Sequence, residues 1–440
     1  MANSGLYWFN HDLRVHDNPA LLEAYLNCDK LICLFVIDEA WFKQTGLNAK
    51  PMGEHRHQFL LQSLSDLNKQ LSERGQKLVV MKGEPVDIIS TIVKYHQIDA
   101  IYRSQHVGVY ENRQWHHLQA DFPRVHFHSV WSHTLFRPEQ LPFGMTHLPE
   151  SFSQFRVAVE SVNIDPPCAM PKHFPLPITS TNGLPSVSLK PAISTSKYVG
   201  GEMGALMHLD DYFSSQLPAN YKNVRNELDG WKNSTKFSAW LASGNISPRK
   251  LFQRLKEFER KNTANESTYW IYFELLWREY FQWYANRFQQ KLFQPQGVST
   301  KKISCCFYPE RYKKWCNGNT PHPLINACMK QLNETGYMSN RGRQIVASYF
   351  VNELQLDWRF GAAYFEQQLI DYDVASNWGN WQYIAGVGPD PRGGRHFNID
   401  KQMQQYDPNQ AFIKRWDGAV TAVNLDSVDA ADWPIMPKSK

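Results

Sequence analysis

The sequence predicts an α/β N-terminal domain with a doubly wound, mostly parallel sheet, followed by an all-α C-terminal domain. Short apolar runs alternate with helical patterns up to about residue 130, whereas helical patterns alone follow after about residue 200. In addition, 440 residues exceed what one hydrophobic core usually serves. We therefore expect one domain over 1–130, a linker over 131–200 and a second domain over 201–440.

Five short apolar runs near the N-terminus have the length and composition of β-strands. They are Leu6–Phe9, Leu31–Ile37, Leu78–Met81, Ala100–Tyr102 and Val125–Phe127. The clearest helix between them covers His55–Arg74, where apolar residues recur with a helical period before Gly75. Strands that alternate with helices favour a parallel sheet covered on both faces. The glycine-rich signatures GxGxxG and GxxxxGKS/T are absent, so a dinucleotide bound in the Rossmann manner is not expected.

The stretch 131–200 contains ten prolines among many Ser and Thr residues, which is typical of a connector, and we assign it no chemistry. Six helices are predicted after it. They cover Phe237–Ala242, Pro248–Arg260, Thr268–Phe288, Pro323–Glu334, Arg341–Glu353 and Arg359–Tyr372. The segment 268–288 is apolar and aromatic on nearly every face, so it should run through the middle of its domain. Its charged residues Glu274, Arg278 and Glu279 exclude a membrane span and need partners where they are buried.

Composition argues against several classes of protein. Lys and Arg number 47 against 42 Asp and Glu, and a net charge of +5 permits a basic patch without establishing nucleic acid as a partner. The seven cysteines show no spacing typical of zinc sites, so we expect reduced thiols, no metal site and a cytoplasmic setting. No window approaches 18 apolar residues without charge, which argues against a membrane protein.

The stretch 371–383, DYDVASNWGNWQY, is the strongest candidate for a functional site. It places two Asp, two Asn, two Trp and two Tyr within thirteen residues. If residues 373–381 are helical, Asp373, Asn377 and Trp381 share one face because they are four positions apart. For any single residue, a buried helix end whose polar groups satisfy one another is the alternative. For the whole cluster we favour a ligand that is both polar and aromatic.

Three further sets of residues suit binding chemistry. Glu274, Trp277 and Arg278 share one helix face and could grip a base by stacking and hydrogen bonding, or form an ion pair beside a core tryptophan. Residues 340–344, NRGRQ, open a predicted helix with groups that suit phosphate, or form a solvated basic helix start. Residues 234–238, STKFS, suit a diphosphate, or act only as an N-cap.

Together these residues resemble the photolyase/cryptochrome family, over nearly the whole chain apart from the linker near 178–200. The motifs that carry the resemblance are Phe9–Asn18 in the α/β part, Tyr221–Arg225 with Ser234–Arg249 at the start of the helical part, and Gly336–Ser348 with Asp371–Tyr383 further on. Within the family, MSNRGRQ at 338–344 and SNWGNWQY at 376–383 are similar to the cryptochrome-DASH branch.

The resemblance implies a U-shaped, non-covalently bound FAD inside the all-α C-terminal domain, which is then an FAD-binding domain. The positions that match its diphosphate-binding residues are Tyr221, Ser234, Thr235, Lys236, Phe237 and Ser238. Asn340 helps to fix the flavin, and Arg343 pairs with Asp371 beside it. Asp373 lies against the ring edge and Asn377 faces N5. An amide cannot donate a proton as a carboxylic acid can, so Asn377 favours the reduced anionic flavin over a persistent neutral radical.

The resemblance also implies light-driven chemistry. Tryptophan is oxidisable enough to relay electrons, although 15 Trp make a suitable set easy to find by chance. The family's relay from flavin to surface matches Trp381, Trp358 and Trp315. Excited, reduced FAD passes one electron to a cyclobutane pyrimidine dimer, and the electron returns after the ring splits. Glu274 and Trp277 match residues that contact the dimer, and Arg225 and Arg341 are candidate contacts to the DNA strand.

Departures from the family pattern refine these expectations. Gln344 and Tyr383 stand where repair enzymes for duplex DNA usually have Met and Trp, so the pocket is more polar. Binding in a more polar pocket offsets less of the free energy needed to unstack a dimer from a duplex. We therefore expect a preference for single-stranded DNA. Asn10 replaces the Arg usual in the opening motif. The branch implies a methenyltetrahydrofolate antenna, with Glu111 at the position that resembles its carboxylate ligand.

We therefore expect a cytoplasmic, monomeric, FAD-dependent photolyase that repairs pyrimidine dimers in single-stranded DNA and could also bind RNA or duplex DNA without sequence specificity. The alternative is a blue-light photoreceptor that binds nucleic acid or a protein partner without repair. The sequence shows no long tail after the helical part, which favours repair in that comparison. A structural scaffold without a cofactor would leave Asp371, Asp373 and Asn377 buried without a reason.

Overall fold

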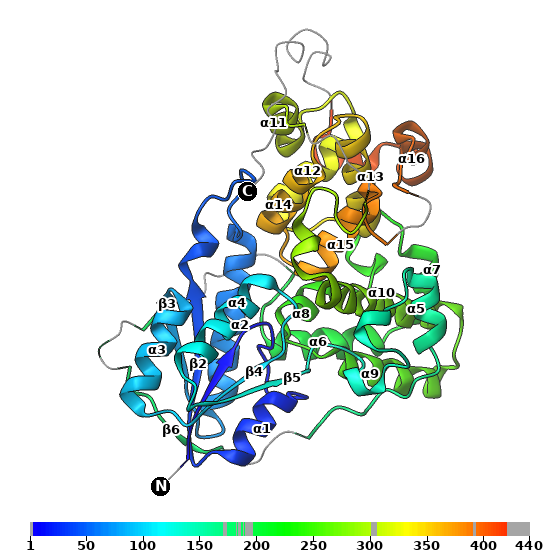
Figure 1. Cartoon of the computed structure of the whole chain (residues 1–440). Helices are drawn as coiled ribbons and strands as arrows, with labels where there is room; N and C mark the ends of the chain where they lie inside the picture. Colours follow the sequence, from blue (N-terminus) through cyan, green and yellow to red (C-terminus); the bar gives the residue numbers. More distant parts are fainter. Residues whose placement is uncertain are drawn as a thin grey trace.

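The computed structural model describes residues 3–169, 174–181, 183, 186–187, 189, 197–300, 306–389 and 393–419. Two parts are evident: a parallel sheet with its helices at the lower left of Figure 1, and a larger body of helices at the right and top. The α/β and all-α fold class predicted from the sequence is confirmed.

Five parallel strands form the sheet in the order β3-β2-β1-β4-β5. They are β1 (Ser4–Phe9), β2 (Lys30–Asp38), β3 (Leu78–Gly83), β4 (Ala100–Ser104) and β5 (His126–Val130), and each predicted strand is present. In the register, Tyr7 lies opposite Cys33 of β2 and Tyr102 of β4. The linker adds β6 (Leu176–Pro177), which pairs with the start of β2. The strand order reverses at β1, so the carboxyl ends of β1 and β4 border the crevice where such sheets bind ligands.

Helices cover both faces of the sheet, as its apolar strands require. They are α1 (Pro19–Asn27), α2 (Glu54–Ser72), α3 (Pro85–His96) and α4 (Val109–Asp121). Leu21 of α1 and Leu64 of α2 belong to the core on one face. Ile89 of α3 and Leu118 of α4 belong to the core on the other face. The predicted helix over 55–74 is therefore confirmed as α2, one residue longer at its start and two shorter at its end.

Within the described residues after 200, the second part is built of helices. They are α6 (Glu202–Phe213), α7 (Leu217–Val224), α8 (Ser238–Ser243), α9 (Pro248–Asn262), α10 (Glu266–Phe288), α11 (Pro309–Asn317), α12 (Pro323–Thr335), α13 (Asn340–Asn352), α14 (Trp358–Gln368), α15 (Val374–Ala385), α16 (Ile399–Tyr406) and α17 (Ala411–Arg415). All six predicted helices are present. The prediction carried α14 to Tyr372 and was wrong at that end, because the backbone turns extended at Leu369.

Shorter elements connect these helices and strands. The linker contains α5 (Phe152–Val159). Single 3-10 turns occur at η1 (Glu39–Phe42), η2 (Pro138–Gln140), η3 (Met145–His147), η4 (Trp231–Asn233) and η5 (Gln289–Phe293).

The aromatic helix α10 runs through the middle of the helical part, as predicted, and its charges have partners. Glu279 is fully buried and accepts hydrogen bonds from the backbone N–H groups of Leu135 and Phe136 at 2.8 and 3.2 Å. Burial raises the pKa of the Glu279 carboxyl to about 7, against these hydrogen bonds. Arg278 donates to the carbonyl of His133 at 2.7 Å, so it is not free to grip a base. Glu279 and Arg278 of α10 thus fasten the linker to the core.

The opening motif of the chain joins the sheet to the helical part. Arg14 is fully buried and donates to the carbonyls of Gly244 and Ser132 at 3.0 and 2.6 Å. Asp17 forms a buried ion pair with Arg249 of α9 at 2.7 Å. Because removing one member of a buried pair costs about 3–5 kcal/mol, this motif is a structural clamp between the two parts.

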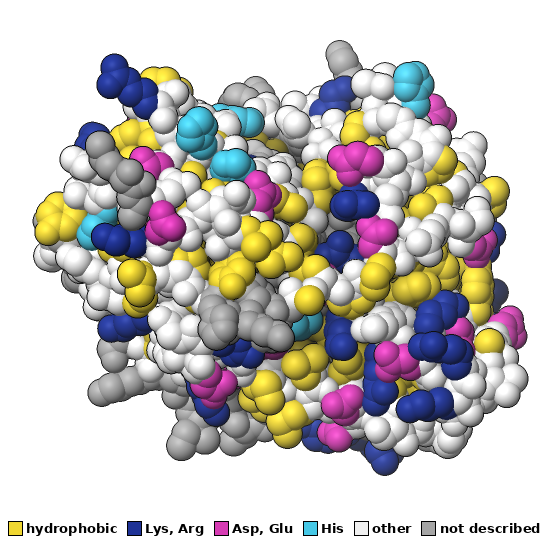
Figure 2. Space-filling view, turned by 90° about the horizontal axis from the view of Figure 1, so that it is seen from below, with side chains coloured by type: hydrophobic (Ala, Val, Ile, Leu, Met, Phe, Trp, Pro, Cys, Tyr) yellow, Lys and Arg dark blue, Asp and Glu magenta, His cyan; other side chains and the backbone are white. Residues whose placement is uncertain are grey.

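Charge on the lower face is mixed. Figure 2 shows basic and acidic side chains interleaved on its right-hand side. On α9, Arg254 pairs with Asp210 at 3.2 Å and Lys256 pairs with Glu259 at 2.7 Å. Over the described residues of this face, basic side chains therefore alternate with acidic ones. Among the described helices, none has the length and apolar character needed to cross a bilayer.

Candidate functional site

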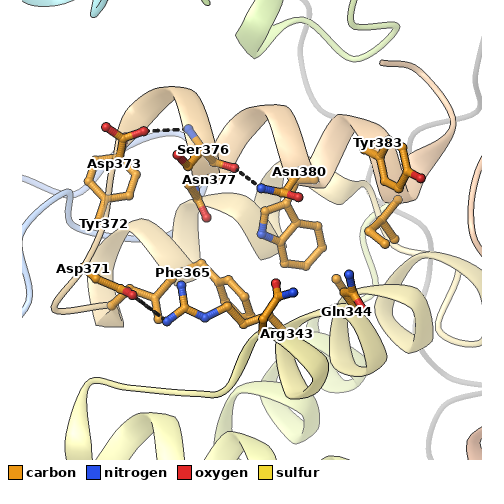
Figure 3. A pocket seen from close by; sticks show the side chains of 15 residues that line it. Arg343, Gln344, Phe365, Asp371, Tyr372, Asp373, Ser376, Asn377, Asn380 and Tyr383 are labelled. Carbon is orange, nitrogen blue, oxygen red and sulfur yellow. Dashed lines mark hydrogen bonds and ion pairs between the residues drawn. The ribbon is translucent and has the colours of Figure 1, made fainter. Parts of the chain in front are cut away.

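A polar and aromatic cavity lies between α13, α14 and α15, and we call it the α13–α15 cavity (Figure 3). It is lined by Asn340, Arg343, Gln344, Ala347, Phe365, Leu369, Asp371, Tyr372, Asp373, Ser376, Asn377, Asn380, Trp381, Tyr383 and Ile384. Eight of the residues proposed from sequence therefore meet in one place: Asn340, Arg343, Gln344, Asp371, Asp373, Asn377, Trp381 and Tyr383.

Asp373 begins α15 and holds its first turn. Its carboxylate caps the helix by accepting the N–H of Ser376 at 2.7 Å. Both oxygens also accept from Nε2 of Gln282 on α10, at 3.0 and 2.8 Å. Burial acts to raise the pKa of Asp373, but the charge of Arg278 and these hydrogen bonds outweigh it and hold the pKa below its usual value. We had considered a helix over 373–381, but Asp373 is the N-cap and the helix begins at Val374. Asn377 and Trp381 follow on the cavity side.

An ion pair crosses the floor of the α13–α15 cavity. Nη2 of Arg343 lies 3.0 and 2.8 Å from the two oxygens of Asp371, and Nε of Arg343 donates to the carbonyl of Met338 at 2.9 Å. Burial opposes the charge on Arg343, yet the Asp371 carboxylate raises the pKa of the guanidinium above its ordinary value. The ion pair expected from the resemblance is therefore present.

Carboxamides face the α13–α15 cavity from α15 (Figure 3). Nδ2 of Asn377 donates to the carbonyl of Ala362 on α14 at 3.0 Å, which leaves its oxygen as an acceptor. Nδ2 of Asn380 donates to the carbonyl of Ser376 at 2.7 Å. A carboxamide does not titrate, so this side of the cavity can form hydrogen bonds but cannot act as an acid. Asn380 had no predicted role, although it follows Asn377 by three positions on the same helix.

The residues expected to bind a diphosphate do not line the α13–α15 cavity, although Lys236 is connected to it through Tyr337. Within the run 234–238, Lys236 is buried with a left-handed φ of 59° and donates to the hydroxyl of Tyr337 at 2.9 Å. The guanidinium of Arg343 lies 5.6 Å from the ring centre of the same tyrosine. Tyr221 is buried on α7, which raises its pKa to about 12. Tyr337 joins the two groups of residues, and the sequence offered no signal for it beyond its place before 338–344.

The residues expected to contact a nucleic acid gather near α7 and α10. Arg225 forms an ion pair with Glu274, and its guanidinium lies 4.2 Å from the ring centre of Trp270. Next to it, Nη2 of Arg341 lies 3.2 Å from Oδ1 of Asn226. Glu274 therefore has a partner already, and a substrate that needs its carboxylate has to displace Arg225.

Trp277 connects these residues to the α13–α15 cavity. Its ring centre lies 6.0 Å from that of Tyr383, in an edge-on arrangement. One face of Trp277 is covered by Phe152 of α5, with ring centres 3.7 Å apart and planes 12° apart. The expectation that the linker carries no chemistry is incomplete, because Phe152 decides which face of Trp277 a ligand can reach.

The expected order of the tryptophan relay is wrong at its end. Trp315 has no exposed surface, so it cannot end the relay at the surface. It lies directly beside Trp381, with ring centres 6.3 Å apart, whereas Trp358 packs against Trp378 at 5.8 Å. The relative burial of three tryptophans is set by tertiary packing, which spacing along the chain does not report.

A second cavity, of about 500 Å³, lies at the carboxyl edge of the sheet, and we call it the sheet-edge cavity. Residues on its sheet side include Asn10, His11, Asp38, Arg56, His106, Glu111 and Gln114. Residues from the helical part include Phe293, Ala363, Glu366, Val374 and Trp378, and Tyr372 lines both cavities. Trp378 donates from Nε1 to Glu366 and to the hydroxyl of Tyr372, each at 3.2 Å, which gives this tryptophan a place that the sequence did not suggest.

Glu111 lies in the sheet-edge cavity, apart from all other predicted site residues. Its Oε2 is 3.6 Å from Nδ1 of His106. Burial acts to raise the pKa of Glu111, but the neighbouring His106 lowers it to about 2. The carboxyl group is therefore ionised at neutral pH.

The α13–α15 cavity suits a flat heterocycle with polar edges. Phe365 and Trp381 supply aromatic surface, while Asn377 and the Arg343–Asp371 pair supply acceptors and donors around it. Among the described residues, its lining contains Asp371, Asp373 and Ser376 but no Cys or His. These side chains therefore suit a bound cofactor ring, which they would hold and orient while the ring supplies the reactive chemistry.

Comparisons with known proteins agree with this geometry. The model of the family "DNA photolyase" matches residues 5–172, and that of the "FAD binding domain of DNA photolyase" matches residues 270–438. "Cryptochrome DASH" of Idiomarina loihiensis is 51% identical over 435 residues, which are 98% of this chain and 96% of the relative. The crystal structure of a Synechocystis cryptochrome has a TM-score of 0.87 at 37% identity, and covers 94% of this chain and 89% of its own. A bacterial class III photolyase from Agrobacterium tumefaciens has a TM-score of 0.81 at 26% identity, and covers 94% and 86%.

Proposed function

The chain belongs to the photolyase/cryptochrome family, and we propose that it repairs cyclobutane pyrimidine dimers in single-stranded DNA under light, with reduced FAD in the α13–α15 cavity. One observation carries the proposal. The cavity that holds the Arg343–Asp371 pair and Asn377 is also lined by Gln344 and Tyr383, and Tyr383 touches the Trp277 ring. A flavin and a flipped base would therefore lie next to each other.

Residues of the helical part would hold the cofactor. Arg343, with its charge fixed by Asp371, is suited to the polar edge of the flavin, and Asp373 lies near the same edge. Asn377 offers its oxygen to N5, because its nitrogen is engaged by Ala362. The positions proposed for the diphosphate are Tyr221, Ser234, Thr235, Lys236, Phe237 and Ser238, and Asn340 would help to fix the flavin. When bound there, FAD would supply light-driven one-electron chemistry to the substrate beside it.

The substrate would bind at the mouth of the α13–α15 cavity. Trp277 is partly exposed and would stack on a base with the surface that Phe152 and Phe281 leave open. Glu274 would accept a hydrogen bond from a base once Arg225 turns to a phosphate of the strand. Arg341, two residues from Arg343 on α13, is a second phosphate contact. A base that stacks on the Trp277 ring, and phosphates that contact arginines, suit single-stranded DNA. Its bases are not held in a duplex stack.

The remaining proposals concern electron supply and light harvesting. Trp381, with Trp315 beside it and Trp358 as the third member of the set, would pass electrons to oxidised flavin. The sheet-edge cavity would hold a methenyltetrahydrofolate antenna, with Glu111 as its carboxylate contact. We accordingly propose that 1–130 carries the antenna and 201–440 carries the chemistry, joined by 131–200.

Restoring the apolar residues usual in duplex-specific enzymes tests the proposal. The double variant Gln344→Met with Tyr383→Trp should increase the ratio of duplex to single-strand repair by about tenfold, since a deeper apolar pocket repays roughly 1–2 kcal/mol more of the unstacking cost. Repair is measured as dimer loss per photon on matched oligonucleotides. Lys256→Gln on α9 is the control and should leave the ratio unchanged. A wild-type protein that reduces its flavin in light but removes no dimers would contradict repair and favour a photoreceptor.

A further inference from the structure

Three oxidisable rings follow one another from the α13–α15 cavity toward the surface. Trp381 lines the cavity and is buried. The ring centre of Trp315 on α11 lies 6.3 Å from that of Trp381, and the ring centre of Tyr364 on α14 lies 5.6 Å from that of Trp315. Trp315 has no exposed surface, whereas Tyr364 is partly exposed. The ring that reaches solvent in this series is therefore a tyrosine.

The other rings that touch Trp315 do not offer a way out. The ring centre of Phe350 lies 4.7 Å from that of Trp315, and the ring centre of Phe365 lies 6.0 Å from it. A phenyl ring is much harder to oxidise than an indole or a phenol, so these two rings fill space without carrying a positive charge. Among the ring contacts of Trp315 with described residues, the one with Tyr364 therefore leads away from the cavity to an oxidisable side chain.

Trp358 leads to another part of the molecule. Its ring centre lies 5.8 Å from that of Trp378, which lines the sheet-edge cavity. Its Nε1 donates to the carbonyl of Pro295 at 2.8 Å. Trp358 and Trp378 are both buried. A positive charge on this pair of indoles would therefore stay inside the protein.

The hydroxyl group of Tyr364 is placed to release a proton. It lies 2.6 Å from Oδ1 of Asn333 and 3.0 Å from the carbonyl oxygen of Cys316. Burial raises the pKa of Tyr364, so the phenol keeps its proton until the ring is oxidised. An oxidised phenol is a strong acid, and this one has access to water. By contrast, Nε1 of the buried Trp315 donates to the backbone carbonyl of Val346 at 3.2 Å, which is not a base.

We propose that Tyr364 is the terminal electron donor of the relay, so that electrons reach the α13–α15 cavity in the order Tyr364, Trp315, Trp381. The inference rests on the proposed function, because it requires a flavin in that cavity. Once light has moved one electron from Trp381 to oxidised flavin, Trp315 gives one electron to Trp381, and Tyr364 gives one electron to Trp315. Tyr364 releases its phenolic proton to water and becomes a neutral radical. An external thiol then gives it a hydrogen atom, which restores the phenol, and pairs of the resulting sulfur radicals combine as disulfides.

Spin trapping tests this proposal by the place of the radical. The purified, flavin-loaded protein is illuminated with a nitroso spin trap and digested, and the adduct is located by mass spectrometry. The wild type should carry the adduct on Tyr364, and Tyr364→Phe should lose it. Tyr312→Phe is the matched control: it removes the hydroxyl of a buried tyrosine whose ring centre lies 6.3 Å from that of Tyr364, and should keep the adduct on Tyr364. Flavin content, read from the absorption spectrum, verifies that each variant is folded.

Flash photolysis gives an independent readout. In Tyr364→Phe the positive charge stops at Trp315 and returns, so the lifetime of the light-induced charge separation should fall about tenfold or more, whereas Tyr312→Phe should keep the wild-type lifetime. A wild-type adduct on a tryptophan or on Tyr312 in place of Tyr364, or equal lifetimes in wild type and Tyr364→Phe, would overturn the proposal. Dimer repair by wild-type protein whose flavin is reduced chemically in the dark needs no relay, so it tests the proposed function separately.

Discussion

The two cavities differ in how the chain builds them. The α13–α15 cavity takes most of its lining from one helix and the segment before it, with α13 and α14 completing it. The sheet-edge cavity is assembled from strand ends, loops and helical segments between residue 10 and residue 378. Helical periodicity places neighbouring side chains on one face, whereas strand order brings together residues that are distant in sequence. A site built mainly from one helix can therefore be predicted from the sequence. A site assembled from distant strand ends largely cannot.

The cavities also differ in chemistry. Polar groups of the α13–α15 cavity have protein partners: Asp371 has Arg343, Asp373 has Gln282 and Ser376, and Asn377 has Ala362. In the sheet-edge cavity His11 and Asn10 have buried atoms without a partner. Fixed partners preorganise a site for one ligand, while unpartnered groups leave room for ligands of more than one kind.

Among the variants considered, Asp371→Asn should have the largest effect on flavin binding. It tests whether fixed polar partners prepare the α13–α15 cavity for its ligand. It leaves Arg343 buried without its counter-charge, which costs about 3–5 kcal/mol and should abolish flavin binding. Flavin per chain, measured by absorbance after purification, reports the loss. Glu259→Gln removes the surface ion pair with Lys256 on α9 and should cost less than about 1 kcal/mol, with normal flavin content. Normal flavin content in Asp371→Asn would refute the role of the pair.

Glu366 gives the sheet-edge cavity a pH dependence of its own. Burial raises its pKa to about 7, from an ordinary value near 4.5 in the unfolded chain. Between these two pH values the folded state binds more protons than the unfolded chain. The contribution of Glu366 to the free energy of unfolding is therefore greatest below about pH 4.5 and falls by up to about 3 kcal/mol as the pH rises through 7. Glu279 contributes similarly from α10.

Thermal unfolding at pH 5 and pH 7 checks this dependence. The unfolding temperature of the wild type should fall toward pH 7, and Glu366→Gln should remove a substantial part of that fall, since glutamine keeps an acceptor for Trp378 without titrating. Equal slopes in wild type and variant would show that Glu366 is ionised throughout.

Trp381→Phe should slow photoreduction of oxidised flavin by about tenfold or more, equivalent to roughly 1.4 kcal/mol in barrier. Gly361 packs against the Trp381 ring so closely that an added Cβ would lie 2.3 Å from it, which fixes the indole beside the cavity. Flash photolysis measures the rate. Trp378→Phe, on the sheet-edge side, should have a smaller effect, and equal slowing by both variants would contradict a route that begins at Trp381.

Glu111→Gln should have the smallest effect on the flavin. Folate binding should weaken about tenfold, since one charged hydrogen bond is worth roughly 1.5–3 kcal/mol, while flavin content and single-strand repair under direct flavin excitation stay normal. Near-ultraviolet absorbance of the purified protein separates the two pigments. Loss of flavin in Glu111→Gln would show that the two cavities are not independent.

The fold and the α13–α15 cavity were predicted in large part from the sequence. The five strands and six helices follow from periodicity, and Asn377 and Trp381 from spacing on one helix. The end of α14 was missed because Leu369 leaves the helix for tertiary reasons, and Asp373 proved to be a cap. The buried position of Trp315 and the stacking of Phe152 on Trp277 depend on packing between distant segments, which no local pattern encodes.

Repair of one defined dimer, in the same oligonucleotide as a single strand and as a duplex, tests the account most directly. The purified wild-type protein with fully reduced flavin is illuminated with blue light, and dimer loss is followed over time for both substrates. A pocket lined by Gln344 and Tyr383 predicts faster repair of the single strand, by about tenfold or more, because the duplex demands a few kcal/mol of unstacking. Equal rates on both substrates, or no dimer loss on either, would contradict it.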